Sequence, residues 1–372
     1  MELINATRMI TGYNMGIEPS GRELLVVVIK GTFHLPRTPD ELLRLHEEQL
    51  PLVMADTFTG EPGFSAPVYE VDFAPRKKRV DVLLNGSAYA PGGKPATRVP
   101  VGLRINDKVK TFAVVGNRHW NSVAGVGITA SAPEPFTVMP ITYDLAFGGV
   151  DNMHENPAKH AAFMRNPVGR GFHKHLKGEW VNGAPLPNTE ELNRPVTNTD
   201  SDYIPMSFGP IGRGWDPRYR YAGTYDDKWL EEHFPFLPPD FDEQYYQAAP
   251  LDQQFEGALG GHEVALVNLS PDGQRHFTLP VFEAPLSFFP KKGEREDQTA
   301  TLDTITFEPD LDRFTMAWRT VRPLRRDLHE IAQVVVGRKG RDWWQQRDRV
   351  AINAPITSGT THNPVLAALQ AS

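Results

Sequence analysis

Proline and glycine recur along most of the chain and limit the regular structure that it can form. The 372 residues include 33 prolines and 31 glycines, whereas their usual shares in proteins are roughly 5% and 7%. Proline ends helices and is excluded from the centre of sheets, and glycine weakens the interior of both. We therefore expect short elements joined by many turns, without long helices.

Apolar runs rich in β-branched residues predict buried strands. The first run covers residues 23–35 and is closed by Pro36. Further runs lie at 78–90, 97–105, 108–116, 261–269, 275–289, 301–310 and 313–321. The pair Asn106-Asp107 suits a tight turn between two of them, and 301–321 has the pattern of a hairpin. The predicted fold class is mainly β, with sandwich-like or barrel-like sheets.

Three short helices are predicted from capping and spacing signals. Thr-Pro-Asp-Glu at 38–41 has the pattern of a helix start, and the helix ends before Pro51. Thr224 with Asp227 three residues later predicts a second helix that ends at Pro235. The third is predicted between Pro323 and Gly337, because one helical face collects Leu324, Leu328, Ile331 and Val335.

These patterns divide the chain into four segments. We expect an N-terminal β subdomain at 1–132 and, at 261–350, C-terminal β hairpins with one helix. Between them, residues 133–260 are rich in proline, glycine and aromatic residues, and a structureless loop of that length is improbable in a compact protein. This central segment is therefore expected to be ordered by packing on the sheets. A mobile tail is expected at 351–372.

Composition excludes several classes of chemistry. The chain has no cysteine, which removes disulfides, thiolate nucleophiles and cysteine zinc sites. Its net charge of -7 gives no overall attraction to nucleic acid or to anionic membranes. The first residues lack the pattern of a signal peptide, and no apolar run reaches 18 residues. We expect a cytoplasmic protein that binds neither nucleic acid nor membrane.

Motifs for cofactor or metal binding are weak. GPIGRG at 209–214 lacks the Lys-Ser/Thr pair of a phosphate-binding loop and is interpreted as a structural turn. Histidines gather between His154 and His175 but lack metal-ligand spacing, and we interpret them as bonded to their neighbours. A metal ion in that region is left open. Otherwise no catalytic, cofactor-binding or metal-binding residue is predicted.

The aromatic residues are most concentrated between 207 and 246. The rings are Phe208, Trp215, Tyr219, Tyr221, Tyr225, Trp229, Phe234, Phe236, Phe241, Tyr245 and Tyr246. Tyrosine, tryptophan and arginine dominate binding hot spots, because they combine apolar area with polar ends. Residues 221–256 also carry nine acidic residues and the single basic residue Lys228. The segment therefore predicts a protein-binding surface, although such rings also form a satellite core beneath a long loop.

The predicted partner-binding residues fall into two chemical groups. The apolar anchors are Trp215, Tyr219, Tyr225 and Trp229. The charged residues are Arg213, Arg218 and Arg220, which orient the partner, and Asp226, a further predicted partner-binding residue. Prolines in this segment restrict the chain in advance, which lowers the entropy lost on binding.

Several motifs resemble a bacterial family labelled a domain of unknown function. They are YDLAFGG at 143–149, RNPVGRGF at 165–172, PMSFGPIGRGWDPR at 205–218, the stretch 222–253 and GHEVALVNLSPDG at 261–273. The resemblance covers about residues 1–290. Family members occur with type VI secretion components, and the family is regarded as effector-loading adaptor chaperones.

The resemblance implies a non-enzymatic adaptor. Its partners are then a type VI effector, or the effector's PAAR-bearing region, and the VgrG spike. We expect the YDLAFGG motif to brace the binding surface through Tyr143, Asp144, Phe147, Gly148 and Gly149.

Two other functions stay open. A hydrolase using the aromatic segment as a substrate platform requires a deep pocket with converging carboxylates or histidines. Acidic candidates exist at 226–227, 231–232 and 240–243, although a solvated acidic face is the simpler interpretation. A carbohydrate-binding β module requires coplanar exposed rings.

Overall fold

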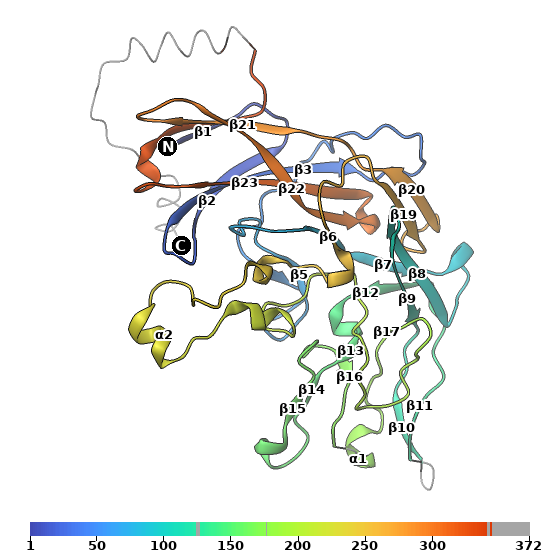
Figure 1. Cartoon of the computed structure of the whole chain (residues 1–372). Coiled ribbons are helices and arrows are strands. Elements are labelled where there is room, and N and C mark those ends of the chain that lie inside the picture. The colour runs from blue at the N-terminus through green and yellow to red at the C-terminus, as the bar shows by residue number, and fades with distance from the viewer. Residues whose placement is uncertain (124–126, 176, 341–342, 344–372) are drawn as a thin grey trace, which may run out of the picture.

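The structure is a computed structural model that describes residues 1–123, 127–175, 177–340 and 343. It confirms a mainly β fold (Figure 1). The α-helices of these residues are two short ones, α1 (Gly178–Val181) and α2 (Asp227–Glu232). The predicted mobile tail, 351–372, lies outside the described residues.

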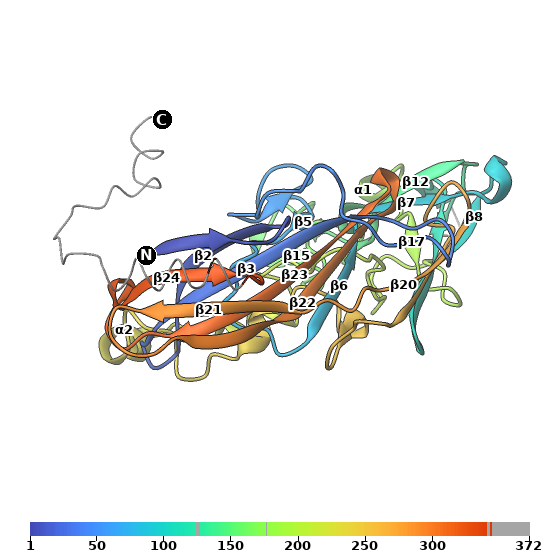
Figure 2. The same ribbon diagram turned by 90° about the horizontal axis from the view of Figure 1, so that it is seen from above.

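The largest sheet has nine strands and curls into a nearly closed barrel. Seven strands follow one another across it, and Figure 2 views most of them from above. In that order they are β1 (Glu2–Asn5), β24 (Ile331–Val336), β21 (Ala284–Pro290), β22 (Glu296–Glu308), β23 (Arg313–Pro323), β3 (Glu23–His34) and β2 (Ile10–Ile17). The other two, β6 (Val80–Leu84) and β18 (Gln254–Phe255), pair with each other, and β6 also pairs with β22. The predicted strand at 23–35 is β3, buried along nearly its whole length.

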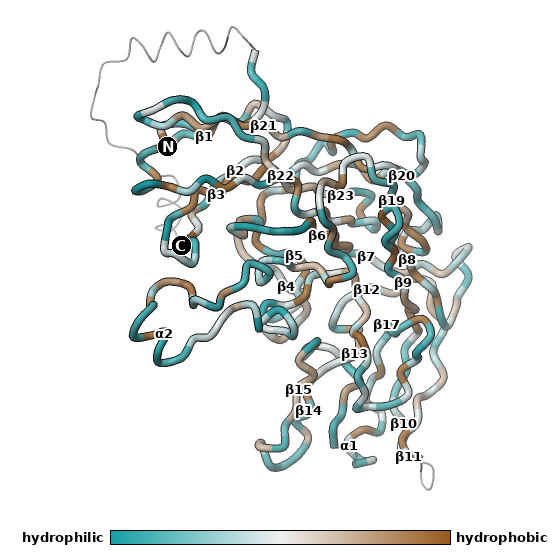
Figure 3. The backbone as a smooth tube through the Cα atoms, viewed as in Figure 1, coloured by the Kyte–Doolittle hydropathy of each residue, from teal (hydrophilic) through white to brown (hydrophobic). Residues whose placement is uncertain are grey.

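A second sheet of five strands packs against the same core. Its order is β17 (Thr189–Glu190), β9 (Lys108–Val115), β8 (Arg98–Ile105), β19 (Glu263–Val267) and β20 (Gln274–Thr278). The predicted Asn106-Asp107 turn joins β8 to β9, with Asn106 at a φ of 50°. Hydrophobic residues recur along β8, β9 and β19, whereas hydrophilic residues prevail around α2 (Figure 3). Phe277 of β20 meets Phe307 and Phe314 of the larger sheet, so both sheets share one core.

Strands from both ends of the chain alternate within these sheets. In the larger sheet β3 pairs with β23 and β1 pairs with β24, and in the smaller sheet β8 pairs with β19. Segments 1–132 and 261–350 therefore contribute to the same two sheets.

Two predicted helices are wrong. Within 38–50 the backbone of His46 pairs instead with Thr32 of β3, and Leu45 forms a bridge with Phe33. The stretch predicted as a helix between Pro323 and Gly337 contains β24, where a run of valines pairs with both β1 and β21. In both places long-range pairing overrides a local helical pattern.

The central segment is irregular but packed. Its lower part, which includes β13 (Phe147–Gly148), joins β10 (Trp120–Val123) of segment 1–132 in a lobe below the sheets in Figure 1. This lobe has a small core of its own, made of Trp120, Phe147, Phe172, Val181, Leu186, Val196 and Tyr203. Gly148 lies at a φ of 152°, and a Cβ atom there would lie 2.1 Å from the carbonyl oxygen of Asn166. The chain can therefore pass this point only with glycine.

Candidate functional site: an aromatic arm and its base

The predicted binding residues separate into a buried base and an exposed arm. We define the aromatic arm as residues 222–241, which carry α2 and its flanking loops. The arm projects from the body at the left of Figure 1. The base is formed by residues 205–221, which lie against the sheets and the segment around Glu70.

Arg218 lies in the base and faces the interior. It is 2% exposed and forms a two-point ion pair with Glu70. It also donates to the carbonyl oxygens of Ile211 at 2.7 Å and Tyr245 at 2.8 Å. These contacts occupy Arg218 within the protein, so it supports the fold of the base and does not face a binding partner.

Arg213 is held in the same network. Its guanidinium donates to the carboxylate of Asp56 at 2.6 and 3.1 Å and lies 3.7 Å from Glu70. Burial alone raises the pKa of Asp56, but hydrogen bonds from Arg213 and from the main chain of Val71 outweigh it and lower this pKa. The base therefore contains a compact pair of arginines neutralised by two carboxylates.

Trp215 is also interior. It is 6% exposed and meets the ring of Tyr143 edge-on, with 5.3 Å between centroids. Tyr143 belongs to the YDLAFGG motif, whose Asp144 accepts hydrogen bonds from Thr59 at 2.7 Å and from the main chain of Ala66 at 2.9 Å. The motif thus contacts the base directly, and Trp215 offers no free surface to a partner in this conformation.

The arm carries the exposed rings. Tyr225 and Phe234 are 54% and 62% exposed, and Leu230 of α2 is 58% exposed. Trp229 lies between the two rings, with centroid distances of 4.7 Å to Tyr225 and 5.7 Å to Phe234. Both contacts are edge-on, with interplanar angles of 69° and 86°. The three rings form one continuous cluster on a projecting segment.

Hydrogen bonds fix the arm in shape. Asp226 caps α2 by accepting from the main chain of Trp229 at 2.8 Å. Thr224, the predicted cap, instead binds the carboxylate of Asp240 through its hydroxyl at 2.7 Å and its N–H at 2.9 Å, which closes the neck of the arm. These bonds from Thr224 lower the pKa of Asp240. The prediction of a helix here is confirmed, with its start moved from Thr224 to Asp226.

A groove lies beside the neck of the arm. It has a volume of about 520 Å³ and is lined by apolar and polar residues that include Ile204, Pro217, Tyr221, Gln244, Pro250 and Leu251. Tyr219 and Arg220 follow Pro217 in the sequence. Arg220 lies over the Tyr219 ring and forms an ion pair with Asp216 at 2.7 Å. Arm and groove together provide apolar surface on both sides of Tyr221.

The comparisons with known proteins identify one family. Residues 20–319 match the model of DUF2169, described as an uncharacterized protein conserved in bacteria. The chain belongs to this family. No curated protein and no solved structure matches the chain.

The match confirms the bacterial family of unknown function that the motifs predicted, and it carries no information about secretion. It extends past residue 290, where the motif resemblance ended, and includes β22 and most of β23. The arm, its base and the groove of this DUF2169 protein all lie inside the matched range. Within the described residues, no helix has both the length and the apolar character needed to cross a lipid bilayer.

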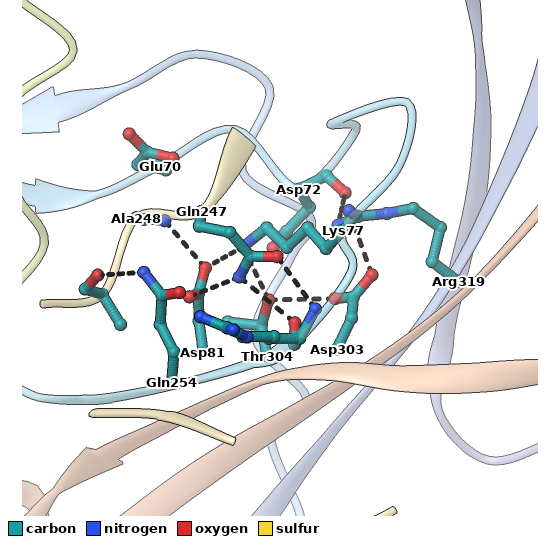
Figure 4. Close-up of polar contacts among 12 residues, drawn as sticks. Glu70, Asp72, Lys77, Asp81, Gln247, Ala248, Gln254, Asp303, Thr304 and Arg319 are labelled. Atoms are coloured by element: carbon teal, nitrogen blue, oxygen red, sulfur yellow. Dashed lines mark hydrogen bonds and ion pairs between the residues drawn. The ribbon is translucent and has the colours of Figure 1, made fainter. Parts of the chain in front are cut away.

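A buried charge network was missed in the sequence (Figure 4). Lys77 binds Asp81 at 2.7 Å and Thr304 at 3.0 Å, while Arg319 pairs with Asp303 at 3.0 Å. Asp303 sits where the register between β22 and β23 shifts, and burial raises its pKa despite the nearby Arg319. No sequence signal identified this network, because its members come from distant parts of the chain.

The network also anchors the chain that returns from the arm. Asp81 accepts from the side chain of Gln247 and from the main chain of Ala248, both at 2.8 Å. The cavity beside these groups measures about 30 Å³, which is room for about one water molecule. The network therefore fastens the chain that returns from the arm, at Gln247 and Ala248, to β6 of the large sheet.

Two of the four histidines between His154 and His175 contact main-chain oxygens. His160 Nε2 lies 2.8 Å from the carbonyl of His154, and His175 Nε2 lies 2.9 Å from that of Lys159. Burial lowers the pKa of His173. Across the described residues, the group with ligand atoms close enough for a metal ion is elsewhere, at His34, His46 and Glu47.

Proposed function

We propose that this DUF2169 protein is a non-enzymatic cytoplasmic adaptor chaperone of type VI secretion. It holds an effector, or the effector's PAAR-bearing region, and helps to load it onto the VgrG spike. The observation that carries the proposal is the rigid cluster of exposed rings on the aromatic arm. The link to secretion comes from the resemblance of the motifs.

The arm has the properties of a protein-binding element. Preordered aromatic side chains lose little entropy on binding and cover a partner's apolar surface. The arm is ordered by its own hydrogen bonds, from the cap at Asp226 to the neck at Thr224 and Asp240. In this proposal Tyr225 and Trp229 are anchors, as predicted, together with Leu230 and Phe234. Arg213, Trp215 and Arg218 support the arm from below.

The charge of the arm indicates the partner's chemistry. Residues 222–241 hold five acidic residues and one lysine. Like charges opposite one another disfavour binding, so the favoured partner surface is apolar at its centre and basic at its rim. Basic effectors and spike components are therefore the preferred cargo.

The ring geometry favours a protein over a carbohydrate. Sugar rings stack on flat, coplanar aromatic faces, whereas the rings of the arm meet edge-on at 69° and 86°. Such a cluster presents ring edges and an apolar ridge. A ridge of this kind fits into a groove or pocket of a folded partner.

The test is co-purification with the effector and VgrG proteins encoded beside the gene. The wild-type chain is compared with the double variant Tyr225→Ala/Phe234→Ala and with Phe64→Ala, a similarly exposed aromatic outside the arm. We expect the arm variant to lose the effector at moderate salt while the Phe64 variant retains it. If the folded arm variant captures as much effector as the wild-type protein does, the proposal is contradicted.

A further inference from the structure

Two histidines and a glutamate meet near the end of β3. The side chains of His34, His46 and Glu47 place their possible ligand atoms within 4.8 Å of one another. His34 Nε2 lies 2.8 Å from a carboxylate oxygen of Glu47. The two imidazole rings are stacked, with 4.5 Å between centroids. Such a set of nitrogen and oxygen donors matches the ligand chemistry of zinc.

The backbone fixes the two histidines on the same face. The N–H of His34 donates to Arg44 at 3.1 Å, and that of His46 donates to Thr32 at 2.8 Å. This short ladder pairs Phe33 with Leu45. Because side chains alternate along paired strands, the rings on either side of this bridge point to the same side.

The segment that carries His46 is further locked by Gln49. Its side-chain oxygen accepts from the Thr32 N–H at 2.8 Å, and its amide donates to the carbonyls of Thr32 and His46, both at 2.8 Å. The ligands are therefore held by regular hydrogen bonding on both sides. Preorganisation of this kind distinguishes a built site from side chains that meet by chance on a surface.

The surroundings suit a bound cation. His46 Nδ1 lies 3.0 Å from the carbonyl oxygen and 3.1 Å from the main-chain nitrogen of Glu48, so the main chain holds this ring nitrogen. The tautomer in which Nδ1 donates to the carbonyl leaves Nε2 as the nitrogen for an ion. Arg313, opposite His34 in the ladder with β23, is paired with Glu308 at 2.7 Å. Its charge is therefore compensated away from the site.

We propose that His34, His46 and Glu47 bind a divalent transition-metal ion of the Zn²⁺ type. The ligands are Nε2 of each histidine and one carboxylate oxygen, and water completes the shell. Two imidazoles select against Mg²⁺ and Ca²⁺, which prefer oxygen ligands. The ion fastens the 44–47 segment to β3 and so stabilises the chain wherever it is bound.

The test is isothermal titration calorimetry, in which ZnCl₂ is added to the metal-free full-length protein. We expect one ion per chain and no comparable binding of MgCl₂. We expect at least tenfold weaker Zn²⁺ binding from each of the variants His34→Gln, His46→Gln and Glu47→Gln. Replacing residues that only support metal ligands already lowers metal affinity about 10- to 100-fold. His276→Gln, an exposed histidine on β20, is the matched control and is expected to bind like wild type.

A folding defect and a lost ligand are told apart by Glu47→Gln. The Glu47 side chain is 75% exposed, so its amide variant is expected to fold like wild type by circular dichroism. Co²⁺ substitution gives a second readout, since a tetrahedral site adds visible absorption that the variants lose. Absence of Zn²⁺ binding to the wild-type protein, or wild-type affinity in all three ligand variants, overturns the proposal.

Discussion

Trp229 and Phe236 are joined by a hydrogen bond of 2.9 Å from the indole Nε1–H to the main-chain carbonyl oxygen. This bond turns the chain after α2 back on itself and brings Phe234 against the indole ring. On the other side Phe236 reaches the turn at Gly21, where a Cβ atom would lie 2.6 Å from its ring. The arm is therefore tied to the loop between β2 and β3 as well as to its own neck.

Removing the indole N–H is expected to loosen the arm without unfolding the protein. Trp229→Phe keeps an aromatic ring but loses a bond worth about 0.5–1.5 kcal/mol. Amide hydrogen exchange across 225–236 is expected to rise, while the melting temperature changes little because the sheets are untouched. The control is Tyr225→Phe, which keeps its ring beside Trp229. Unchanged exchange in the Trp229 variant contradicts this role for the bond.

Arg218 and Arg220 provide a matched test of the base. Arg218→Ala removes the two-point partner of Glu70 and leaves it only the longer contact of 3.7 Å with Arg213. Breaking a buried pair costs up to about 3–5 kcal/mol. Arg220→Ala breaks a pair with Asp216 in which the arginine is mostly exposed, and because exposed pairs contribute little to stability, a much smaller loss is expected. Urea unfolding of the two variants measures the difference. Equal losses of stability contradict a structural role for Arg218.

The sequence allowed prediction of elements whose signal is local. Residues 23–35 and the hairpin at 301–321 were predicted because β-branched runs and turn residues lie within a few positions of each other. The pattern at Leu324 and Leu328 was misleading, because the valines of β24 pair with β1 at the opposite end of the chain. Local spacing cannot report such a partner.

The same limit applies to the site. The aromatic richness of 207–246 was visible, but which rings are exposed depends on distant contacts. Arg218 is buried because Glu70, 148 positions earlier, lies against it, and Trp215 is buried under Tyr143. Tyr225 and Phe234 stay exposed because α2 projects from the sheets. The ladder that brings His34 and His46 together also overrides a local helix signal.

The ion pair of Asp56 with Arg213 predicts that the stability of the folded state depends on pH. The folded state lowers the pKa of Asp56 below its unfolded value of about 3.9. Its contribution to stability is therefore complete above that unfolded value and is lost as the pH falls through the lower folded value. Asp56→Asn is expected to destabilise by about 2 kcal/mol at pH 7, the scale of a hydrogen bond to a charged group.

That difference between wild type and Asp56→Asn is expected to shrink as the pH falls below about 4, because the Asp56 carboxyl is then protonated first in the unfolded state and, at still lower pH, in the folded state too. Urea unfolding of both proteins at pH 7, 4 and 3 measures it. Comparing the pair at each pH removes the effects of other carboxyl groups. A difference that stays constant down to pH 3 contradicts the electrostatic origin.

Alanine variants of Gly148 and Gly63 distinguish the cost of backbone strain at a positive φ from the cost of a steric clash. Both have positive φ values, 152° and 84°, but a Cβ atom at Gly63 meets nothing within 4 Å, whereas one at Gly148 meets the Asn166 carbonyl at 2.1 Å. Gly63→Ala is expected to cost about 1–2 kcal/mol from backbone strain alone. Gly148→Ala adds a clash with the main chain of Asn166. The Asn166 side chain donates to the carbonyls of Tyr143 and Phe147 in the YDLAFGG motif, so its main chain cannot move away without disrupting that contact. Thermal unfolding is therefore expected to show a clearly larger fall in melting temperature for Gly148→Ala, and equal falls contradict the steric argument.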